Sequence, residues 1–302
     1  MAIKQVRSLI NGTWYTLTLN EATGAYEAEI TAPQITSFHQ SGGYYNVAVE
    51  VTNDAGTVGT ASGTTMESLR LDVNERIPPV ITILSPTNGA RVANNQQPVV
   101  FTVVDEANGS GINLSSLVVE LDGVAASSGE IVTTAIANGY SVTFTPGAAM
   151  GNGEHTVTVN VSDNDGNAAT EVSTTFTVDT VAPTLNVTSP TGGMVTSSTS
   201  IVLKGTTNDE TSSPVSVTAT VNGADVGAIT VGADGSFEKT LTLTQEGENE
   251  IIVTATDSTG LTSSVTILVT LNTAVPKVLS ASLTPNPVDA GKTVIISVVV
   301  SE

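Results

Sequence analysis

Cysteine is absent from this sequence of 302 residues, which also has only two histidines and only nine lysines and arginines against 29 aspartates and glutamates. Without cysteine, disulfides, thiolate metal sites and cysteine nucleophiles are excluded. Two histidines leave little material for zinc or triad chemistry. The formal net charge of −20 argues against nucleic acid and against anionic membranes, because Lys and Arg supply the contacts to both. We therefore expect a non-enzymatic protein with no catalytic residues, no nucleic-acid partner and no membrane partner.

Long apolar runs are missing as well. No stretch approaches the ~20 apolar residues that a membrane-spanning helix needs. The opening segment is interrupted by charged residues and by an Asn11-Gly12 turn, which does not fit the apolar region of a signal peptide. We expect neither a transmembrane segment nor a signal peptide in this chain.

The sequence is rich instead in Val, Ile and Thr runs that alternate with period two. Clear examples are residues 49–51, 157–161 and 266–270, and Gly, Asn, Asp or Pro bounds each of them. No long window carries an apolar stripe with a period of 3.6 residues. The predicted fold class is all-β.

Three landmarks recur along the chain. A long strand entering an acidic turn occupies residues 43–56, 153–166 and 247–260. An apolar residue followed by Asn-Gly or Asp-Gly occurs at 10–12, 121–123 and 221–223, and these dipeptides favour the type I′ turn of a hairpin. A Pro-led linker at 77–79, 181–183 and 274–276 opens each unit. The chain is therefore built from repeats of about one hundred residues.

These landmarks resemble tandem bacterial immunoglobulin-like domains, which occur in Gram-positive phage tails and in bacterial surface arrays. The Pro-led linkers, the Ser-Pro-Thr turns at 85–87 and 189–191 and the Val-x-Val-x-Asp-x-x-Gly pattern at 159–166 carry the resemblance. It implies tandem sandwiches in an elongated array on a virion or another extracellular surface. It specifies function poorly, because this sandwich hosts many unrelated roles.

The repeat is incomplete at both ends. In the two complete units, about forty residues and two strands precede the hairpin dipeptide, whereas the first dipeptide is already at Asn11-Gly12. The C-terminal segment holds the reverse, a first strand pair without its sandwich. We predict a partial domain at 1–75 lacking its first two strands, complete domains at 76–179 and 180–273, and a strand pair at 274–302.

We hypothesise that the C-terminal strand pair of one molecule completes the N-terminal domain of the next. Such a head-to-tail contact builds a filament, or a ring if it closes. Three alternatives stay open: the tail is a fragment of a longer array, the first unit is a smaller self-sufficient sandwich, or the tail inserts into a different protein. The residues predicted to form the interface are Val278, Leu283, Val294, Ile296, Val298, Val300, Trp14, Tyr15 and Tyr45.

We expect no metal site and no cofactor, and calcium is the one candidate ion. The nearest approach to a calcium loop is Asp163, Asp165 and Asn167, but the glutamate that a helix–loop–helix site needs at its twelfth position is Thr174. A hairpin turn held by Asx hydrogen bonds explains the same residues. Glu75 and Asp179 lie near the expected domain junctions, where some adhesive arrays bind calcium.

Aromatic side chains are concentrated at the N-terminus, where six of the eleven precede residue 50. They are typical of protein interfaces and of sugar-stacking platforms. The alternative is that a domain short of two strands fills its core with larger side chains. His155 aligns with Tyr45 and Asn249 in the other repeats, near the corner where sandwiches place a tyrosine, so we expect a structural hydrogen bond there.

The sequence thus predicts a structural or assembly protein, with a phage tail or virion surface as the first setting. Its expected partners are further copies of the chain, as a homo-oligomer or polymer, or other virion or surface proteins. Two alternatives are a bacterial surface adhesin or stalk and a carbohydrate-binding accessory module that takes a cell-surface glycan.

Overall fold

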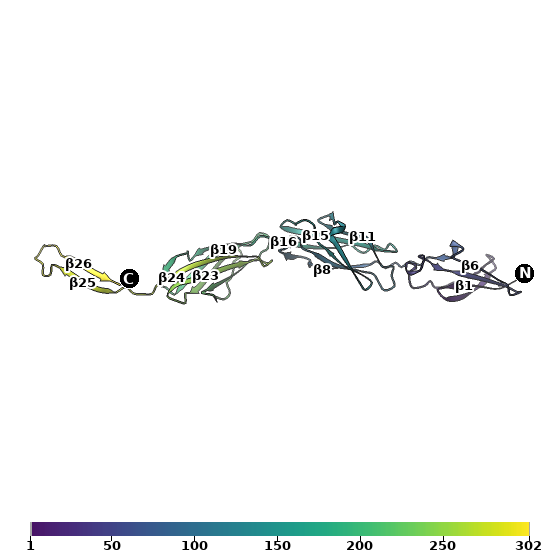
Figure 1. Ribbon diagram of the computed structural model, residues 1–302, viewed down its shortest axis with the longest axis horizontal. Coiled ribbons are helices and arrows are strands. Elements are labelled where there is room, and N and C mark those ends of the chain that lie inside the picture. Colours follow the sequence, from purple (N-terminus) through teal and green to yellow (C-terminus); the bar gives the residue numbers. More distant parts are fainter. Residues whose placement is uncertain (1, 302) are drawn as a thin grey trace. The chain divides into compact units, whose positions relative to one another are not determined.

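The computed structural model describes residues 2–301, which form β-strands with three short 3-10 helices (Figure 1). The chain divides into two compact units, Met1–Asp179 and Thr180–Glu302. Val and Ile alternate with Thr and Ser along most strands, so that one face of each strand is apolar. The predicted all-β class is confirmed.

The first part of unit one is a single five-stranded antiparallel sheet, which we call the N-terminal sheet. Its strands, in the order β3-β2-β1-β5-β6, are β1 (Ile3–Ile10), β2 (Thr13–Asn20), β3 (Ala25–Glu27), β5 (Ala48–Asn53) and β6 (Val58–Ser62). The rest is irregular chain with a short ladder and two 3-10 helices: β4 (Tyr45–Asn46), β7 (Arg70–Leu71), η1 (Ser37–His39) and η2 (Glu67–Leu69).

The second part of unit one is a complete two-layer sandwich, which we call the second sandwich because it follows the N-terminal sheet. One sheet, in the order β13-β14-β10-β8, consists of β8 (Val80–Ser85), β10 (Val99–Val104), β13 (Ile131–Ile136) and β14 (Gly139–Phe144). The other, in the order β12-β11-β15-β16-β9, consists of β9 (Ala90–Val92), β11 (Ile112–Leu121), β12 (Val124–Ala125), β15 (Gly153–Asp163) and β16 (Val172–Val178). A 3-10 helix, η3 (Ser128–Glu130), precedes β13.

Unit two contains a sandwich of the same design and a separate hairpin. The first sheet consists of β17 (Thr184–Ser189), β19 (Ser200–Asn208) and β22 (Ser236–Thr242). The second, in the order β18-β24-β23-β20-β21, consists of β18 (Met194–Thr196), β20 (Ser216–Val221), β21 (Ala224–Asp225), β23 (Gly247–Thr256) and β24 (Thr262–Leu271). The hairpin pairs β25 (Val278–Thr284) with β26 (Ile295–Val300).

The hairpin dipeptides form turns of the predicted kind. Asn11, Asp122 and Asn222 have φ of 48°, 52° and 52°, and the glycine after each has φ of 78–80°. Type I′ turns require positive φ at both central residues, which Asn, Asp and Gly tolerate. These turns join β1 to β2, β11 to β12 and β20 to β21.

The N-terminal sheet corresponds to one layer of each sandwich. Its order β2-β1-β5-β6 matches β12-β11-β15-β16 and β21-β20-β23-β24. In both sandwiches a short parallel strand, β9 or β18, pairs with the last strand of this layer. Within residues 2–75, β6 has no such partner and no second sheet beyond the β4–β7 ladder faces the first. That residues 1–75 form a domain lacking its first two strands stays a prediction.

Candidate functional site

The C-terminal hairpin exposes one wholly apolar face. Directly paired residues of an antiparallel ladder project to the same side. On one side these pairs are Val278–Val300, Ala281–Val298 and Leu283–Ile296, and on the other they are Ser280–Val299, Ser282–Ser297 and Thr284–Ile295. Every residue of both strands is exposed. We call the first side the apolar face of the hairpin.

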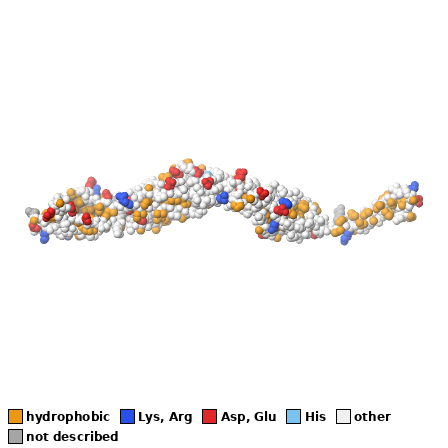
Figure 2. Space-filling view, turned by 180° about the vertical axis from the view of Figure 1, so that it is seen from behind, with side chains coloured by type: hydrophobic (Ala, Val, Ile, Leu, Met, Phe, Trp, Pro, Cys, Tyr) orange, Lys and Arg blue, Asp and Glu red, His pale blue; other side chains and the backbone are white. Residues whose placement is uncertain are grey.

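The structure places five of the six predicted hairpin interface residues on this face. They are exposed by 49–68%: Val278, Leu283, Ile296, Val298 and Val300. The sixth, Val294, directly precedes β26 and is half-buried. Figure 2 shows hydrophobic side chains along the hairpin, at the right of that view. Large apolar side chains rarely gather in this way on a monomer without a partner.

The predicted aromatic interface residues of the N-terminal sheet are divided between its two faces. Tyr15 pairs with Ser8 and is half-buried on the inner face, which also carries Val6. Trp14 projects from the outer face and is 41% exposed. The Arg7 guanidinium lies 4.1 Å from the centre of its ring, in a cation–π contact. Trp14 and Tyr15 therefore do not form one surface.

Tyr45 belongs to the core rather than to an exposed interface. It is only 4% exposed, and its hydroxyl donates a 2.9 Å hydrogen bond to the carbonyl of Ile35. The expectation of an interface role is wrong for this residue, because its side chain fills the space beside the irregular chain of the N-terminal region. The position of Tyr45 agrees with the alternative, in which a domain short of two strands fills its core with larger side chains.

The N-terminal region keeps an open edge and an apolar hollow. The edge is β6, most of whose residues are exposed. The hollow has a volume of about 210 Å³ and is lined by Ile10, Ile30, Val47, Ser68, Leu69, Arg70 and Leu71. Unpaired strand edges bind added strands, and apolar hollows accept their side chains.

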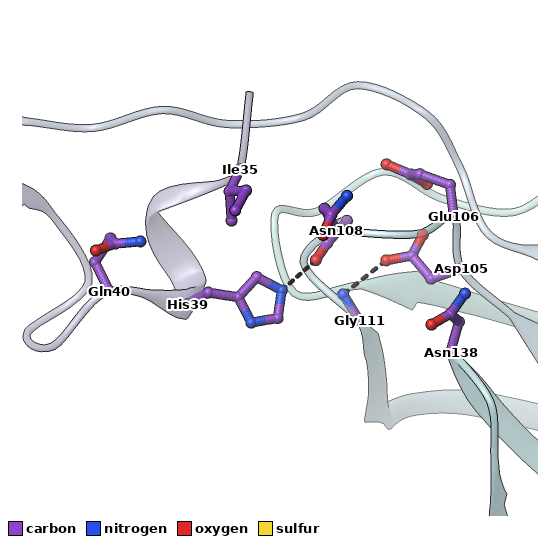
Figure 3. A pocket seen from close by; sticks show the side chains of 9 residues that line it. Ile35, His39, Gln40, Asp105, Glu106, Asn108, Gly111 and Asn138 are labelled. Carbon is purple, nitrogen blue, oxygen red and sulfur yellow. Dashed lines mark hydrogen bonds between the residues drawn. The ribbon is translucent and has the colours of Figure 1, made fainter. Parts of the chain in front are cut away.

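A group of carboxylates lies between the linker before β8 and the second sandwich. Glu75 comes from the linker, and Asp105 and Glu106 directly follow β10. One carboxylate oxygen of each residue lies within 4.8 Å of the others. Asp105 and Glu106 also line a pocket of about 450 Å³, together with His39 of η1 (Figure 3). We call these three residues the junction carboxylates.

Burial and mutual repulsion shift the acidity of this group. Burial raises the pKa of Glu75 to about 7, and the neighbouring carboxylate of Asp163 adds to the effect. Burial also raises the pKa of Glu106, with a further contribution from Asp105. Burial alone would raise the pKa of Asp163, but hydrogen bonds from Glu75 and Asn167 lower it below its usual value. The cluster therefore retains a proton near neutral pH.

The predicted metal-loop residues take part in a turn. Asp163 accepts a 2.8 Å bond from the backbone N–H of Asn167, four positions later. Asn53 and Asp257 accept the equivalent bond from Thr57 and Leu261. The same bond from the backbone to an Asn or Asp side chain thus closes the turn in all three repeats, as the turn explanation requires.

The other two loop residues hold the linker. Asp165 accepts a 3.0 Å bond from the backbone N–H of Glu75. The Asn167 side chain donates to the Glu75 carbonyl at 3.2 Å. The acidic turn therefore positions Glu75 beside the two carboxylates that follow β10.

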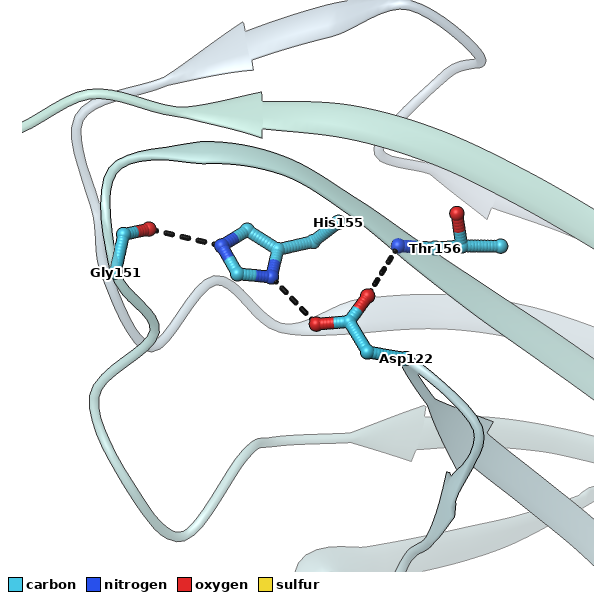
Figure 4. Close-up of polar contacts among 4 residues, drawn as sticks. All are labelled: Asp122, Gly151, His155 and Thr156. Atoms are coloured by element: carbon cyan, nitrogen blue, oxygen red, sulfur yellow. Dashed lines mark hydrogen bonds and ion pairs between the residues drawn. The ribbon is translucent and has the colours of Figure 1, made fainter.

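Each repeat closes its corner with a different side chain at the aligned position. His155 lies with Nε2 2.8 Å from the Gly151 carbonyl and Nδ1 2.7 Å from the Asp122 carboxylate (Figure 4). Asn249 donates to the carbonyl of Gln245 and accepts from Asn222, which aligns with Asp122. These are the structural hydrogen bonds predicted for this position. Burial alone would lower the pKa of His155, but the two oxygens raise it.

Two family models match the two sandwiches. Residues 88–180 match a bacterial Ig-like domain, and residues 183–273 match domain B of glucodextranase. The chain carries two tandem immunoglobulin-like sandwiches, of which the first matches a bacterial Ig-like domain. Families of this kind are typically non-catalytic, and bacterial Ig-like domains are commonly extracellular. The described residues contain no helix with the length and apolarity needed to cross a bilayer.

Solved structures with similar folds include other tandem modules. The fibronectin(III)-like modules of Clostridium thermocellum CbhA are 21% identical over 64% of this chain and 94% of theirs, with a TM-score of 0.40. An I-band fragment of titin is 13% identical over 89% of this chain and 88% of its own, with a TM-score of 0.41. No curated protein matches the chain. These similarities transfer no ligand or partner to the immunoglobulin-like chain.

Sequence reasoning placed Glu75 near a junction but did not pair it with Asp105 and Glu106. A signal for them exists, because an Asp-Glu pair follows the corresponding strand in both complete domains, at 105–106 and 209–210. Only the fold shows that the end of β10 and the linker meet.

Proposed function

We propose that this chain is a non-enzymatic assembly protein of a phage tail or virion surface. It self-associates head-to-tail by β-strand complementation, the hairpin of one copy binding the N-terminal sheet of the next. The observation that carries this proposal is the apolar face of the hairpin. It has the composition of a sandwich core, yet each of its residues within β25 and β26 is exposed.

The hairpin is built like the first strand pair of each sandwich. The pairs β8–β10, β17–β19 and β25–β26 are all antiparallel, and each contains one register shift. In the second sandwich the β10 residues Val99, Phe101 and Val103 are fully buried against the opposite sheet. The N-terminal sheet is the counterpart of that opposite sheet. The hairpin and the N-terminal sheet therefore supply the two layers of one sandwich.

Two features of the N-terminal region support docking there. The free edge of β6 is the position at which β9 and β18 pair in the complete sandwiches. In the hairpin, residues 285–294 lie between β25 and β26, just as β9 lies between β8 and β10 and β18 lies between β17 and β19. The hollow beside Ile10 would accept apolar side chains. Main-chain hydrogen bonds would supply affinity, and alternating Val and Ile would set the register.

A second copy is the occupant to which we commit. The hairpin's residues are exposed, so the sandwich of its own unit does not cover them. Complete burial of one Val or Ile side chain is worth about 1.5–3 kcal/mol. Several such residues on one face provide enough driving force for association between chains, which must also offset the loss of translational freedom.

Paired variants of the full chain test the assembly. Ile296→Asp with Val298→Asp places charge on the apolar face, where the two side chains are 68% and 52% exposed. Ile295→Asp with Val299→Asp makes the same change on the other face, at 65% and 54%. Sedimentation and electron microscopy should show concentration-dependent oligomers for the wild type and the second variant, and monomers for the first. A monomeric wild type, or equal loss in both variants, would overturn head-to-tail assembly.

The setting needs a separate measurement. Mass spectrometry of purified virions should find the protein at many copies per particle. Recovery from the bacterial cell surface instead would favour the adhesin or stalk. Binding on a glycan array would favour the carbohydrate-binding module, although the Arg7 guanidinium already covers one face of the Trp14 ring.

A further inference from the structure

We propose that β13 of the second sandwich is a lateral docking edge, at which the β13 strand of a second copy of this chain pairs antiparallel across a two-fold axis. The contact goes beyond the head-to-tail assembly and does not depend on it, because β13 belongs neither to the hairpin nor to the N-terminal sheet. The inference rests on a free strand edge, on an uncharged sheet face and on a self-complementary sequence.

The first observation is that β13 is a free edge. It lies at the end of its four-stranded sheet, where β14 is its one ladder partner among the described residues. Residues 132–136 are all exposed. A strand with one neighbour leaves half of its backbone N–H and C=O groups without a ladder partner. A further strand would satisfy those groups with main-chain hydrogen bonds.

The other edges of the two complete sandwiches are protected. Natural proteins protect sheet edges by short length, by charge or by proline. Four of these edges, β9, β12, β18 and β21, are only two or three residues long. The edge strand β22 carries Glu238 and Lys239. Prolines flank β8 and β17 at both ends, at positions 79, 86, 183 and 190. By contrast, β13 has six residues, no charge and no flanking proline.

The second observation is the uncharged outer face of the sheet that β13 ends. The ladder pairs place three rows of side chains on it: Val132, Thr143 and Val100; Thr134, Ser141, Thr102 and Thr82; Ile136, Gly139, Val104 and Val80. The corresponding face in unit two carries the ion pair between Lys204 and Glu238. In a chain with a net charge of −20, two copies repel each other least where no charge faces the contact.

The charged residue next to β13 is held by its own chain. Glu130 directly precedes the strand, and its carboxylate accepts backbone bonds from Ser127 at 2.7 Å and from Gly147 at 2.6 Å. These bonds tie the carboxylate to the turn before β13 and to the chain after β14. Glu130 therefore does not guard the free edge in the way that Glu238 and Lys239 guard β22.

The third observation identifies a second copy as the occupant. A two-fold axis perpendicular to the sheet keeps the outer side chains of both copies on one side, so that outer residues pair with outer residues. With the axis at Thr134, Val132 of one copy faces Ile136 of the other, and Thr134 faces its own counterpart. Val132 and Ile136 are exposed by 64% and 41%. The pairing therefore covers the two large apolar side chains of the outer face of β13.

A single contact of this size is weak. Six residues from each chain form a small interface, of the kind that transient complexes use. Dilute chains therefore do not pair through β13, and the contact becomes populated at high protein concentration. An assembly that presents many copies of β13 in parallel would strengthen it through avidity.

Disulfide trapping tests the pairing, because the chain has no cysteine of its own. Thr134→Cys is made in the Ile296→Asp, Val298→Asp chain, so that head-to-tail assembly does not contribute and the two proposals can fail separately. Directly paired residues have Cα atoms about 4.5–5.5 Å apart, which suits a disulfide. Thr82→Cys is the matched control, because Thr82 is exposed on the same face but at the opposite edge. Mild oxidation at high protein concentration should give severalfold more covalent dimer for Thr134→Cys.

Two further comparisons test the register and the edge. In an equal mixture of Val132→Cys and Ile136→Cys chains, mixed disulfides should exceed both homodimers, because each residue faces the other across the axis. Val132→Lys should abolish the Thr134→Cys dimer. Val80→Lys should leave it unchanged, since Val80 lies on β8 at a matching exposure of 63%.

The outcomes that would overturn lateral pairing are specific. Equal dimer yields for Thr134→Cys and Thr82→Cys would show random collision. Homodimers in excess in the mixture would contradict the axis at Thr134. A dimer that survives Val132→Lys would contradict docking at this edge. Circular dichroism checks that the lysine variants fold, and Ile136→Lys replaces Val132→Lys if the latter does not.

Discussion

The two complete sandwiches and the two partial elements are made from the same kind of strand but differ in what they bury. Each sandwich holds a core of fifteen buried apolar residues. Among residues 2–75 the buried apolar residues are Val6, Ile10 and Tyr45, and among residues 274–301 there are none. Val and Ile are abundant in all four regions. The difference therefore lies in the presence of a second layer rather than in strand composition.

The largest expected contrast concerns removal of an apolar side chain. Phe101 is fully buried in β10, paired with Ile83 and Val142. Phe101→Ala should lower the unfolding free energy of the second sandwich by about 3–5 kcal/mol. Ile296→Ala, in dilute solution where chains do not associate, should cost less than about 0.5 kcal/mol. Urea denaturation followed by circular dichroism measures both. A large loss for Ile296→Ala would show that the hairpin packs on its own chain.

Glycines within strands provide a second contrast. A Cβ on Gly139 would overlap the carbonyl oxygen of Val103 on the neighbouring strand, whereas a Cβ on Gly59 in β6 would meet nothing within 4 Å. Gly139→Ala should therefore cost about 1–3 kcal/mol through overpacking. Gly59→Ala should stabilise the N-terminal sheet by about 0.5 kcal/mol, because alanine restricts the unfolded chain. Thermal unfolding measures the stability of both variants. A loss of stability in Gly59→Ala would contradict the prediction, because it would show that β6 already has a neighbouring strand.

The corner residues should differ in their dependence on pH. The pKa of His155 is raised above its usual value and that of Asp122 is lowered. Stability from the histidine is full below its unfolded pKa of about 6.5 and declines as pH rises through the raised value. Stability from Asp122 is present above about pH 3.8 and is lost as pH falls through its lowered value.

His155→Gln should therefore cost most near pH 5, by about 0.5–1 kcal/mol given the partial exposure of Asp122, and least once the pH has risen past the raised pKa of His155. Urea denaturation at pH 5 and pH 8 measures the change. Asn249→Ala in the third domain serves as the control, because its hydrogen bonds do not titrate in this range. A loss that is the same at both pH values would contradict a charged His155–Asp122 pair.

The smallest expected effect is at an ion pair of the N-terminal sheet. Arg7 lies 2.6 Å from Glu50, and both side chains are partly exposed, by 41% and 24%. Arg7→Gln should cost about 0.5 kcal/mol and should shift Trp14 fluorescence, because the cation–π contact is lost. High salt should lower the unfolding free energy of the wild type toward that of the variant, because salt screens the ion pair between Arg7 and Glu50. An unchanged emission spectrum would show that Arg7 does not cover the indole in solution.

Much of the fold was predictable because its signals are local. Alternation of Val and Ile identifies strands, and Asn-Gly or Asp-Gly identifies the turns, since both depend on neighbouring residues alone. Tyr45 shows where this reasoning fails. Aromatic residues look alike in sequence whether they are exposed or buried, and only the irregular chain around Ile35 decides that Tyr45 lies inside.

The junction carboxylates were only partly predictable for a related reason. Asp163, Asp165 and Asn167 formed a visible motif, but they serve the turn and hold the linker. Asp105 and Glu106 lie thirty residues from Glu75, and the repeated Asp-Glu pairs at 105–106 and 209–210 do not show which residues they meet. Their proximity arises from the return of β10 toward the linker, which is a long-range consequence of sheet pairing.

By itself, the sequence determined the all-β class, the repeat and its hairpin turns, because each of these follows from periodicity and local backbone preference. Only the tertiary structure decided which side chains share a face, which are buried and which charges meet. Burial depends on what the opposite layer supplies. The exposed apolar face of the hairpin and the buried free oxygen of Asp105 therefore became visible only after the strands were paired.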